Sequence, residues 1–203
     1  MTKASRTLAP AAFDAEYYER FYERRATRVQ GPKEVAHLAR GILGVVEWLG
    51  GRVDTVIDVG AGTGLWRDWF AEHRPAASYR SVDVSPYACE RYGHERRDIA
   101  TWRARGRFDL VVCQGVLPYL PDAAAAAAID NLGAMTRGFL YLEAVTAFDL
   151  ATVCDRALTD SALLPRAGAW YRDHLAPHYV PIGLGVWMSR RFDAQLYELE
   201  RGA

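Results

Sequence analysis

Residues 56–66, with the sequence VIDVGAGTGLW, restrict the possible folds more than any other part of the chain. The run begins as a short apolar strand that contains Asp58, and it then has glycine at three alternate positions, Gly60, Gly62 and Gly64. Glycine can take a positive φ, and its lack of a Cβ lets a ligand approach the backbone closely. Such a turn leads into a helix whose first N–H groups are free to bind a nucleotide-like ligand.

The glycine spacing and the acid together indicate which ligand fits. Turns that bind dinucleotides follow the spacing G-x-G-x-x-G, with a diphosphate lying on the glycines. Here the spacing is G-x-G-x-G, and Leu65 stands where the third dinucleotide glycine would be. A carboxylate at Asp58 would repel a diphosphate and attract an amine or another cation. The run therefore predicts a cationic nucleoside without phosphates, and a turn that binds no ligand is the alternative.

In these residues the chain resembles the class I methyltransferases that depend on S-adenosylmethionine (SAM). The first motif of that family is an acid, one further residue and then G-x-G-x-G. The resemblance implies that SAM is the cofactor and that the turn and its flanks contact it, at Asp58, Gly60, Ala61, Gly62, Gly64 and Trp66.

Two acids further along the chain extend the resemblance. Residues 79–86 read YRSVDVSP, a short strand that ends in Asp83 and is followed by Val84. An acid about 20 residues beyond a glycine turn is where a ribose-binding carboxylate belongs, although Asp83 could instead cap the next helix. In the family, the run RRDIATW implies that Asp98 accepts a hydrogen bond from adenine and that Ile99 packs on its ring. The alternative for Asp98 is a cap of the following segment.

The fourth element is the run 108–122, FDLVVCQGVLPYLPD. It predicts a buried strand that leaves the sheet at Gln114, at the carboxyl edge where open α/β sheets bind their ligands. Gln114 is therefore expected at the cofactor. Asp109, at the start of the strand, is expected to cap a strand end far from the chemistry.

Helical and strand patterns alternate after residue 33. Strands are expected at 54–59, 79–83, 95–98, 108–113 and 138–144, and helices at 33–49, 64–72, 86–92, 122–135 and 167–175. Such alternation predicts a parallel sheet with helices on both faces. Two further strands, 179–188 and 192–200, are separated by a short link and are expected to pair antiparallel. The family ends with such a hairpin, whereas a nicotinamide-binding domain continues in parallel units.

We therefore expect an α/β fold with three α/β/α layers and a doubly wound, mostly parallel, seven-stranded sheet that ends in the antiparallel hairpin. An N-terminal helical cap is expected in residues 1–32, with a mobile tail at 1–12 and an amphipathic helix at 13–28, and the methyltransferase domain in 33–203. Tyr17, Tyr18 and Tyr22 would form a lid over the sulfonium, because aromatic faces attract cations. Packing on the sheet is the alternative, and Tyr18 and Tyr22 are included among the expected cofactor contacts.

Four residues are candidates for catalysis. Glu143 lies at the end of the fifth expected strand, where a buried carboxylate is costly unless it is paired. Tyr171, His174 and His178 come just before the hairpin, and a histidine could accept a proton near neutral pH. Each histidine alone is more often a surface or capping residue. The His-x-x-x-His spacing contains Pro177 and lacks an evident third ligand, so no metal is expected.

Composition agrees with a cytoplasmic enzyme that acts on a small molecule. The 203 residues include 25 basic and 25 acidic side chains, which gives no basic excess for nucleic acid. No apolar run is long enough for a membrane, and no signal-peptide core is evident. We expect transfer of a methyl group from SAM to oxygen or nitrogen of a metabolite or natural product, as in bacterial enzymes, by a monomer or homodimer. The alternatives are a SAM-fold binding or regulatory protein without methyl transfer, and a nicotinamide-dependent oxidoreductase.

Overall fold

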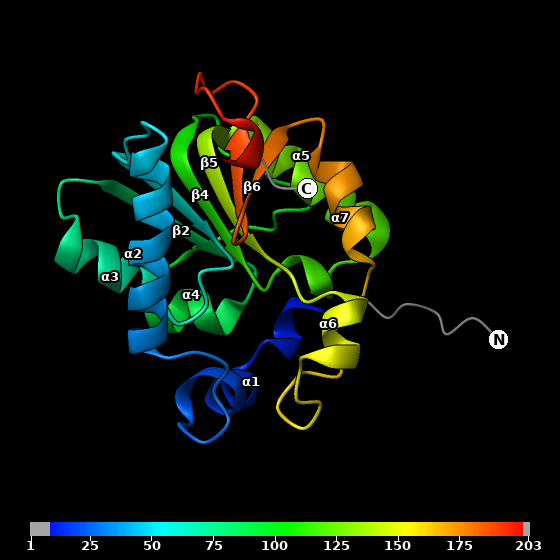
Figure 1. The fold of residues 1–203 in the computed structure, drawn as a ribbon. Helices are drawn as coiled ribbons and strands as arrows, with labels where there is room; N and C mark the ends of the chain where they lie inside the picture. Colours follow the sequence, from blue (N-terminus) through cyan, green and yellow to red (C-terminus); the bar gives the residue numbers. More distant parts are fainter. Residues whose placement is uncertain (1–8, 201–203) are drawn as a thin grey trace.

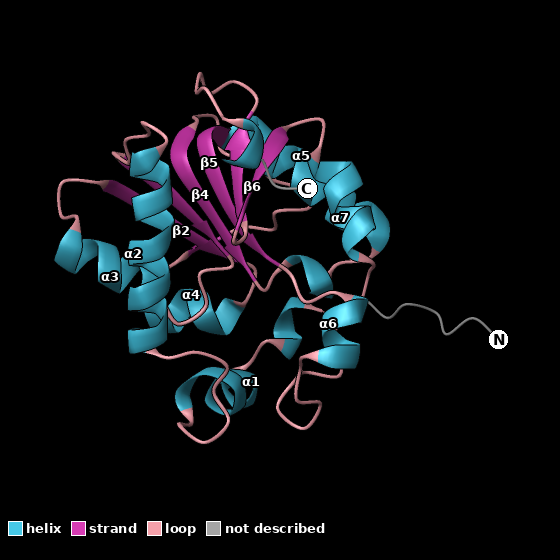
Figure 2. Cartoon of the chain, viewed as in Figure 1, coloured by secondary structure: helices cyan, strands magenta, loops and turns pink. Residues whose placement is uncertain are grey.

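A seven-stranded sheet forms the centre of the molecule, and helices cover both of its faces (Figures 1 and 2). The structure is a computed structural model that describes residues 9–200. The strand order is β3-β2-β1-β4-β5-β7-β6. The bounds are β1 Thr55–Val59, β2 Ser78–Asp83, β3 Glu95–Arg96, β4 Phe108–Gln114, β5 Thr136–Glu143, β6 Tyr179–Gly183 and β7 Val186–Ser189. The first five are parallel, and β7 pairs antiparallel with both β5 and β6, which confirms the predicted fold.

The helices follow the expected alternation. They are α1 Ala15–Tyr18, α2 Pro32–Trp48, α3 Leu65–His73, α4 Pro86–Tyr92, α5 Asp122–Met135, α6 Ala147–Thr152 and α7 Gly168–Leu175. Pro32 begins α2, where its missing N–H costs nothing, and Glu34 accepts a hydrogen bond from the Gly31 N–H at 2.9 Å. The buried residues of α2 lie three or four positions apart, at Val35, Ala39, Ile42, Leu43 and Val46.

Two apolar cores hold the layers together, one on each face of the sheet. On one face, α2 and α3 pack on side chains of β1, β4, β5 and β7, including Val56, Leu110 and Phe139. On the other face, α5 and α7 pack on Ile57, Val111 and Leu140. Consecutive strand residues therefore serve opposite cores, as the period of two along a strand requires, and the parallel strands are apolar on both sides.

The C-terminal hairpin is present, but its predicted turn was wrong. The chain reverses at Leu184 and Gly185, inside the segment expected as one strand, and residues 192–200 form no strand. Both turn residues have positive φ, 54° and 77°, which is the geometry of a tight two-residue hairpin. Phe192 instead packs on Phe139, with ring centroids 4.8 Å apart. Alternating apolar residues concealed the turn, although glycines flanking Leu184 marked it.

The N-terminal segment also differs from the single helix expected at 13–28. Asp14 caps α1 by accepting a hydrogen bond from the Tyr17 N–H at 3.0 Å, and α1 continues as one π-helical turn, Glu19–Glu23. Of the expected tail, residues 1–8 lie outside the described part, and Pro10–Ala12 form a 3₁₀ turn. The segment lies beyond the sheet, with α1 and α6 near the same end of the molecule (Figure 1). The domain division at residue 32 remains a prediction.

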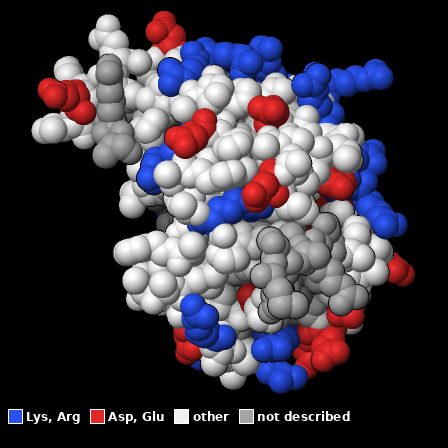
Figure 3. All heavy atoms as spheres, turned by 90° about the vertical axis from the view of Figure 1, so that its right-hand side faces the viewer, with Lys and Arg blue, Asp and Glu red and all other residues white. Residues whose placement is uncertain are grey.

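Charged side chains of both signs are mixed on the face of the molecule shown in Figure 3. Basic residues gather along the upper rim in that view, and acidic residues lie among and below them. Within residues 9–200, no helix is both long and apolar enough to cross a membrane.

Candidate active site

A cavity of about 540 Å³ lies at the carboxyl edge of the parallel strands. Its floor is formed by the ends of β1, β2, β4 and β5, and its cover by the N-terminal segment and residues 154–163. Small-molecule sites typically measure about 300–1,000 Å³, are largely apolar and contain a few polar groups. The position agrees with the rule that open α/β sheets bind ligands beyond the carboxyl ends of their strands.

The glycine turn after β1 is fixed from two sides at Gly62. Its N–H donates to Oδ2 of Asp83 at 2.9 Å, and its carbonyl oxygen lies 2.9 Å from Nε2 of His94. Gly60 has a φ of 72°, and a Cβ there would be 2.2 Å from Cγ2 of Val116. Glycine is therefore required at Gly60 both for its conformation and for the space beside it.

His94 is a buried support of this turn that sequence reasoning missed. Its Nδ1 lies 2.9 Å from the Ser81 hydroxyl, opposite the Nε2 contact to Gly62. Because a carbonyl oxygen can only accept, we assign the proton to Nε2. Burial lowers the pKa of His94, although the Gly62 carbonyl and Asp83 act to raise it, and the neutral ring fits these two partners. A lone histidine in the link between α4 and β3 gave no pattern that would have revealed this role.

Asp58 and Asp83 lie at the cavity as expected, and both carboxylates are buried, with 2% and 5% of their surface exposed. Oδ2 of Asp58 accepts a hydrogen bond from the Tyr79 hydroxyl at 2.8 Å. Burial raises the pKa of Asp58 to about 7. Burial also raises the pKa of Asp83, although N–H donors from Ser85 and Gly62 act to lower it. Two buried acids favour a cation or hydroxyl donors over a diphosphate.

Asp98 and Ile99, which follow β3, line the cavity together with Val84, which follows β2. Oδ1 of Asp98 accepts a hydrogen bond from the Ala100 N–H at 2.9 Å, so the capping role considered from the sequence is present. Asp98 nevertheless lines the cavity, and among the described residues no donor is bonded to its Oδ2. Ile99 is 5% exposed and supplies an apolar wall beside it.

A polar network crosses the ends of β4 and β5. The Trp66 indole N–H donates to Oε1 of Gln114 at 2.8 Å. Nε2 of Gln114 donates to Oε1 of Gln30 at 2.7 Å and to Oε2 of Glu143 at 3.1 Å. The Tyr141 hydroxyl donates to the same Glu143 oxygen at 3.0 Å. Both the oxygen and the nitrogen of the Gln114 side-chain amide thus have partners, which fixes the orientation of this side chain at the sheet edge.

Aromatic side chains from the N-terminal segment form the cover of the cavity. Tyr17 and Tyr119 share a hydrogen bond of 2.9 Å between hydroxyls, and Tyr119 donates to Oδ2 of Asp160 at 3.1 Å. Tyr18 and Tyr22 also line the cavity, with ring centroids 5.5 Å apart. Burial raises the pKa of both hydroxyls, which therefore stay neutral. The segment thus supplies uncharged aromatic faces directly above the strand ends.

The structure brings most of the predicted cofactor residues together around the cavity. The following predicted residues line it: Asp58, Gly60, Ala61, Gly62, Trp66, Asp83, Val84, Asp98, Ile99, Gln114, Tyr18 and Tyr22, and also Glu143. Gly64 does not line it. With a φ of 80°, Gly64 instead begins α3, where its carbonyl accepts from the Asp68 N–H. Asp109 takes hydrogen bonds from Thr55 and Arg137 at the amino edge, as predicted.

Three predicted catalytic residues lie away from the cavity. Tyr171 lies on α7, where its side chain is buried in the core, and its hydroxyl is 3.4 Å from Nη1 of Arg166. His174 stacks on Trp170, with centroids 3.9 Å apart, and its Nδ1 lies 2.8 Å from the Trp170 carbonyl oxygen. His178 precedes β6, which runs parallel to β5, so it lies at the amino edge of the sheet. There its Nε2 contacts Asp130 at 2.8 Å.

Tyr171, His174 and His178 are not among the residues that line the cavity at the carboxyl edge. Closeness to the hairpin in sequence suggested a site, but a strand has two ends, and these residues precede β6 rather than follow it. Gln30, Tyr119 and Asp160 line the cavity instead and were missed. They come from a linker and two loops, whose positions depend on tertiary packing. Among residues 9–200, no three His, Cys, Asp or Glu side chains gather in a way that could hold a metal ion.

The profile of a protein family described as a methyltransferase domain matches residues 13–192. The chain belongs to this family. The matched segment includes the aromatic cover, the glycine turn and the hairpin. No curated protein matches the chain.

Solved structures of methyltransferases share the fold. Magnesium protoporphyrin IX methyltransferase from Synechocystis, with bound SAM, is 21% identical and has a TM-score of 0.55 over 90% of this chain and 89% of that one. The N-methyltransferase NodS from Bradyrhizobium japonicum, with S-adenosylhomocysteine (SAH), is 18% identical, with a TM-score of 0.57 over 90% and 100%. The plantazolicin methyltransferase BpumL is 12% identical, with a TM-score of 0.65 over 85% of this chain and 74% of that one. The fold is thus that of SAM-dependent class I methyltransferases.

Proposed function

We propose that this methyltransferase transfers the methyl group of SAM to an oxygen or nitrogen of a small-molecule acceptor. The observation that carries the proposal is the row of polar side chains along one sheet edge. Asp98, Asp83, Asp58, Gln114 and Glu143 lie within two residues of the carboxyl ends of successive strands and line the same cavity. At one end of this row, Asp98 and Asp83 suit the adenine and the ribose hydroxyls. At the other end, beyond the glycine turn, is the carboxylate of Glu143.

In this proposal each part of the cofactor has its own partner in the row. Asp83 accepts from the ribose diol, and Asp98 with Ile99 binds the adenine, and all three residues line the cavity. Asp58, buried beside the glycine turn, attracts the cationic methionine part of SAM. The aromatic rings of Tyr18 and Tyr22 lie on the cover, where they favour a sulfonium. These assignments match the charges of SAM and do not match a diphosphate.

Catalysis in this proposal depends on positioning. SAM supplies an electrophilic methyl group with a thioether as its leaving group. The protein excludes water with its aromatic cover and holds a nucleophile in line, which is worth on the order of 7–11 kcal/mol. Glu143 is the side chain at the sheet edge that is placed to accept a proton from the acceptor.

The size of the cavity and the mixture of charges in Figure 3 support a small acceptor, without nucleic acid or membrane. We propose that the protein works in the cytoplasm as a monomer or homodimer. The family match leaves the nicotinamide-dependent oxidoreductase without support. A SAM-binding protein that does not transfer methyl groups is the remaining alternative.

Calorimetric titration of the folded protein with SAM, SAH and NADH tests the cofactor. We expect micromolar binding of both adenosyl compounds and none of NADH. Release of SAH from SAM in the presence of a library of alcohols, phenols and amines then tests methyl transfer. Folded protein that binds neither SAM nor SAH would overturn the proposal. Binding without turnover on any acceptor would favour the binding-protein alternative.

A further inference from the structure

The two carboxylate oxygens of Glu143 differ in the hydrogen bonds that they make with the described residues. Both hydrogen bonds to its side chain, from Gln114 and Tyr141, go to Oε2. Among the described residues Oε1 accepts no hydrogen bond, and Glu143 lines the cavity. The donors on Oε2 orient the carboxylate, and Oε1 remains available to a donor on a ligand.

The sheet order places Glu143 beyond the residues assigned to the cofactor, a step that rests on the proposed function. Asp83 ends β2 and Glu143 ends β5, and the order β2-β1-β4-β5 separates them by three strand spacings. Neighbouring strands lie about 4.8 Å apart, so the two carboxylates are separated by about 14 Å across the sheet. With the ribose at Asp83 and the methionine part beside the glycine turn, Glu143 faces the acceptor.

The basic side chains that line the cavity have other neighbours. Among the described residues these are Arg28 and Arg97. Arg97 pairs with Glu95 at 3.5 Å and lies over the Trp102 ring at 5.5 Å from its centroid. The Arg28 guanidinium packs against Gly31. Neither contact involves Glu143, and among the described residues no basic side chain forms an ion pair with it.

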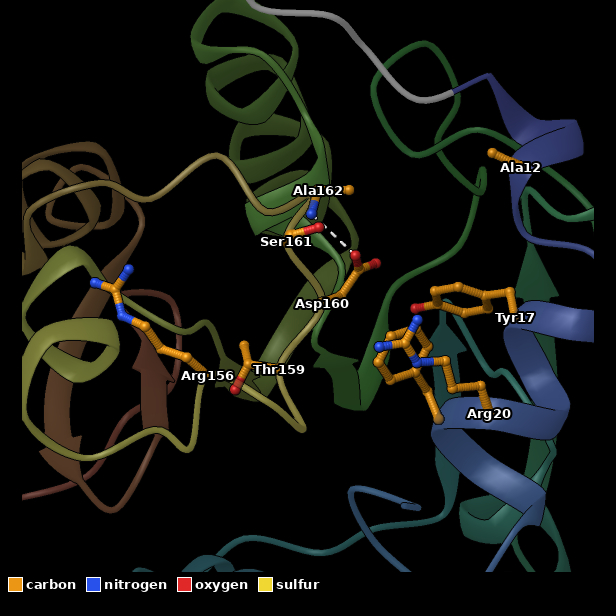
Figure 4. A pocket seen from close by; sticks show the side chains of 9 residues that line it. Ala12, Tyr17, Arg20, Arg156, Thr159, Asp160, Ser161 and Ala162 are labelled. Atoms are coloured by element: carbon orange, nitrogen blue, oxygen red, sulfur yellow. Dashed lines mark hydrogen bonds between the residues drawn. The ribbon is translucent and has the colours of Figure 1, made fainter.

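A second hollow of about 260 Å³ adjoins the aromatic cover and contains Arg20 and Arg156 (Figure 4). In this view Arg156 is directed away from Tyr17 and Asp160. Arg20 lies over the Phe21 ring, 4.9 Å from its centroid. Both arginines are exposed, so water and salt screen their charges. They do not offset the carboxylate at the sheet edge.

The wall opposite the strand ends suits a cation that carries an apolar body. It consists largely of aromatic rings, from Phe13, Tyr17, Phe21, Tyr22 and Tyr119. Aromatic faces attract cations when both are shielded from water. The same rings also offer apolar surface to the rest of an acceptor.

We propose that the acceptor is a primary or secondary amine with an aromatic or other apolar body, and that its nitrogen binds Oε1 of Glu143. The ammonium form binds first and gives one proton to Glu143, which later releases it to water. The free nitrogen lone pair then forms a bond to the methyl carbon of SAM. The carbon–sulfur bond breaks, its electron pair stays on sulfur as SAH, and the product is the methylated ammonium.

Matched ligands test this inference on the protein saturated with SAH. We would titrate 2-phenylethylamine, 2-phenylethanol and phenylacetate, together with a wider fragment library, and measure each dissociation constant. The amine is expected to bind about ten- to a hundredfold more tightly than the carboxylate, because a charge-assisted hydrogen bond is worth that factor. Amines should likewise be enriched among the library compounds that bind.

Two variants separate the role of Glu143 from a general effect of charge. Glu143→Gln keeps the side-chain shape and an acceptor for Gln114, and it should abolish the preference for amines while SAH still binds. Asp130→Asn removes one negative charge at the amino edge, where Asp130 contacts His178, and should keep the preference. Preference for alcohols or carboxylates, equal binding of all three, or binding of none overturns the inference. The wild-type comparison decides this even if Glu143→Gln does not fold. Loss of SAH binding by the wild type would instead overturn the proposed function.

Discussion

Gln114 donates a hydrogen bond to Gln30 at 2.7 Å, which joins the end of β4 to the linker between the aromatic cover and α2. The two residues are 84 positions apart in the sequence. Gln114 also accepts a hydrogen bond from Trp66 and donates one to Glu143. Its side-chain amide therefore contacts α3, the linker that follows the cover, and the end of β5. The position of the cover is thereby coupled to the strand ends that would bind the cofactor.

Replacement of Gln30 tests this coupling. Gln30→Ala removes the acceptor for the Gln114 amide, a net loss of about 0.5–1.5 kcal/mol. We expect SAH to bind about threefold to tenfold more weakly and trypsin to cleave faster at Arg24 and Arg25. Titration and timed proteolysis measure the two effects. Gln195→Ala, which changes an exposed glutamine, serves as the control, and equal behaviour of the two variants would show that Gln30 does not hold the cover.

Asp83 should affect stability as well as cofactor binding. Asp83→Ala leaves the N–H groups of Gly62 and Ser85 without their acceptor. An unsatisfied buried donor costs about 1–3 kcal/mol, so urea unfolding of the free protein should show a loss within that range or larger. Asp83→Asn retains one acceptor oxygen and should lose less stability, yet it should still bind SAH poorly. A free energy of unfolding unchanged in Asp83→Ala would contradict the contacts at Gly62.

Asp58 should make the free protein less stable as pH rises. Its pKa is about 7 when folded, against 3.8 as the ordinary value, so between these values the folded chain holds a proton that the unfolded chain has released. The free energy of unfolding therefore falls from pH 4 to 7 and levels above. Between pH 5 and pH 8, the free energy of unfolding of Asp58→Asn should rise by on the order of 3 kcal/mol relative to that of the wild type.

The control for Asp58 is Asp109→Asn. Although burial acts to raise the pKa of Asp109, hydrogen bonds from Arg137 and Thr55 lower it. A depressed carboxyl pKa contributes stability that is lost only as pH falls below the ordinary range. The difference between Asp109→Asn and wild type should therefore stay constant from pH 5 to 8. Urea unfolding at several pH values measures both differences, and parallel curves for Asp58→Asn and wild type would refute the burial effect.

Gly60 and Gly93 separate backbone strain from lack of space. Their φ values are 72° and 76°, but a Cβ on Gly60 would be 2.2 Å from Val116, whereas one on Gly93 has no described atom within 4 Å. Gly93→Ala should cost about 1–2 kcal/mol from strain alone. Gly60→Ala should cost about 1–3 kcal/mol more through overpacking. Adding Val116→Ala to Gly60→Ala should restore part of that loss, and equal unfolding energies for the two glycine variants would argue against the contact.

The parallel part of the fold could be predicted from the sequence, and so could most of the residues that line the cavity beside the glycine turn. Local patterns decide both, because a buried strand, a glycine turn and an acid at a strand end are each encoded within a few residues. The C-terminal hairpin was predicted with its turn misplaced, since the alternation around Leu184 is compatible with one long strand or two short ones. Gly64 was grouped with the ligand-binding glycines. It is instead the N-cap of α3, and its carbonyl oxygen accepts a hydrogen bond from the Asp68 N–H.

The sequence by itself determined that an acid and a glycine turn stand at the carboxyl edge of a parallel sheet, because strand direction and turn conformation are local properties. Only the tertiary structure decided that Gln114 meets both Glu143 and Gln30, and that His94 supports Gly62. It also placed His178 at the opposite edge. These relationships join residues that are far apart in sequence, and their distances depend on how helices and loops pack on the sheet, which no short pattern encodes.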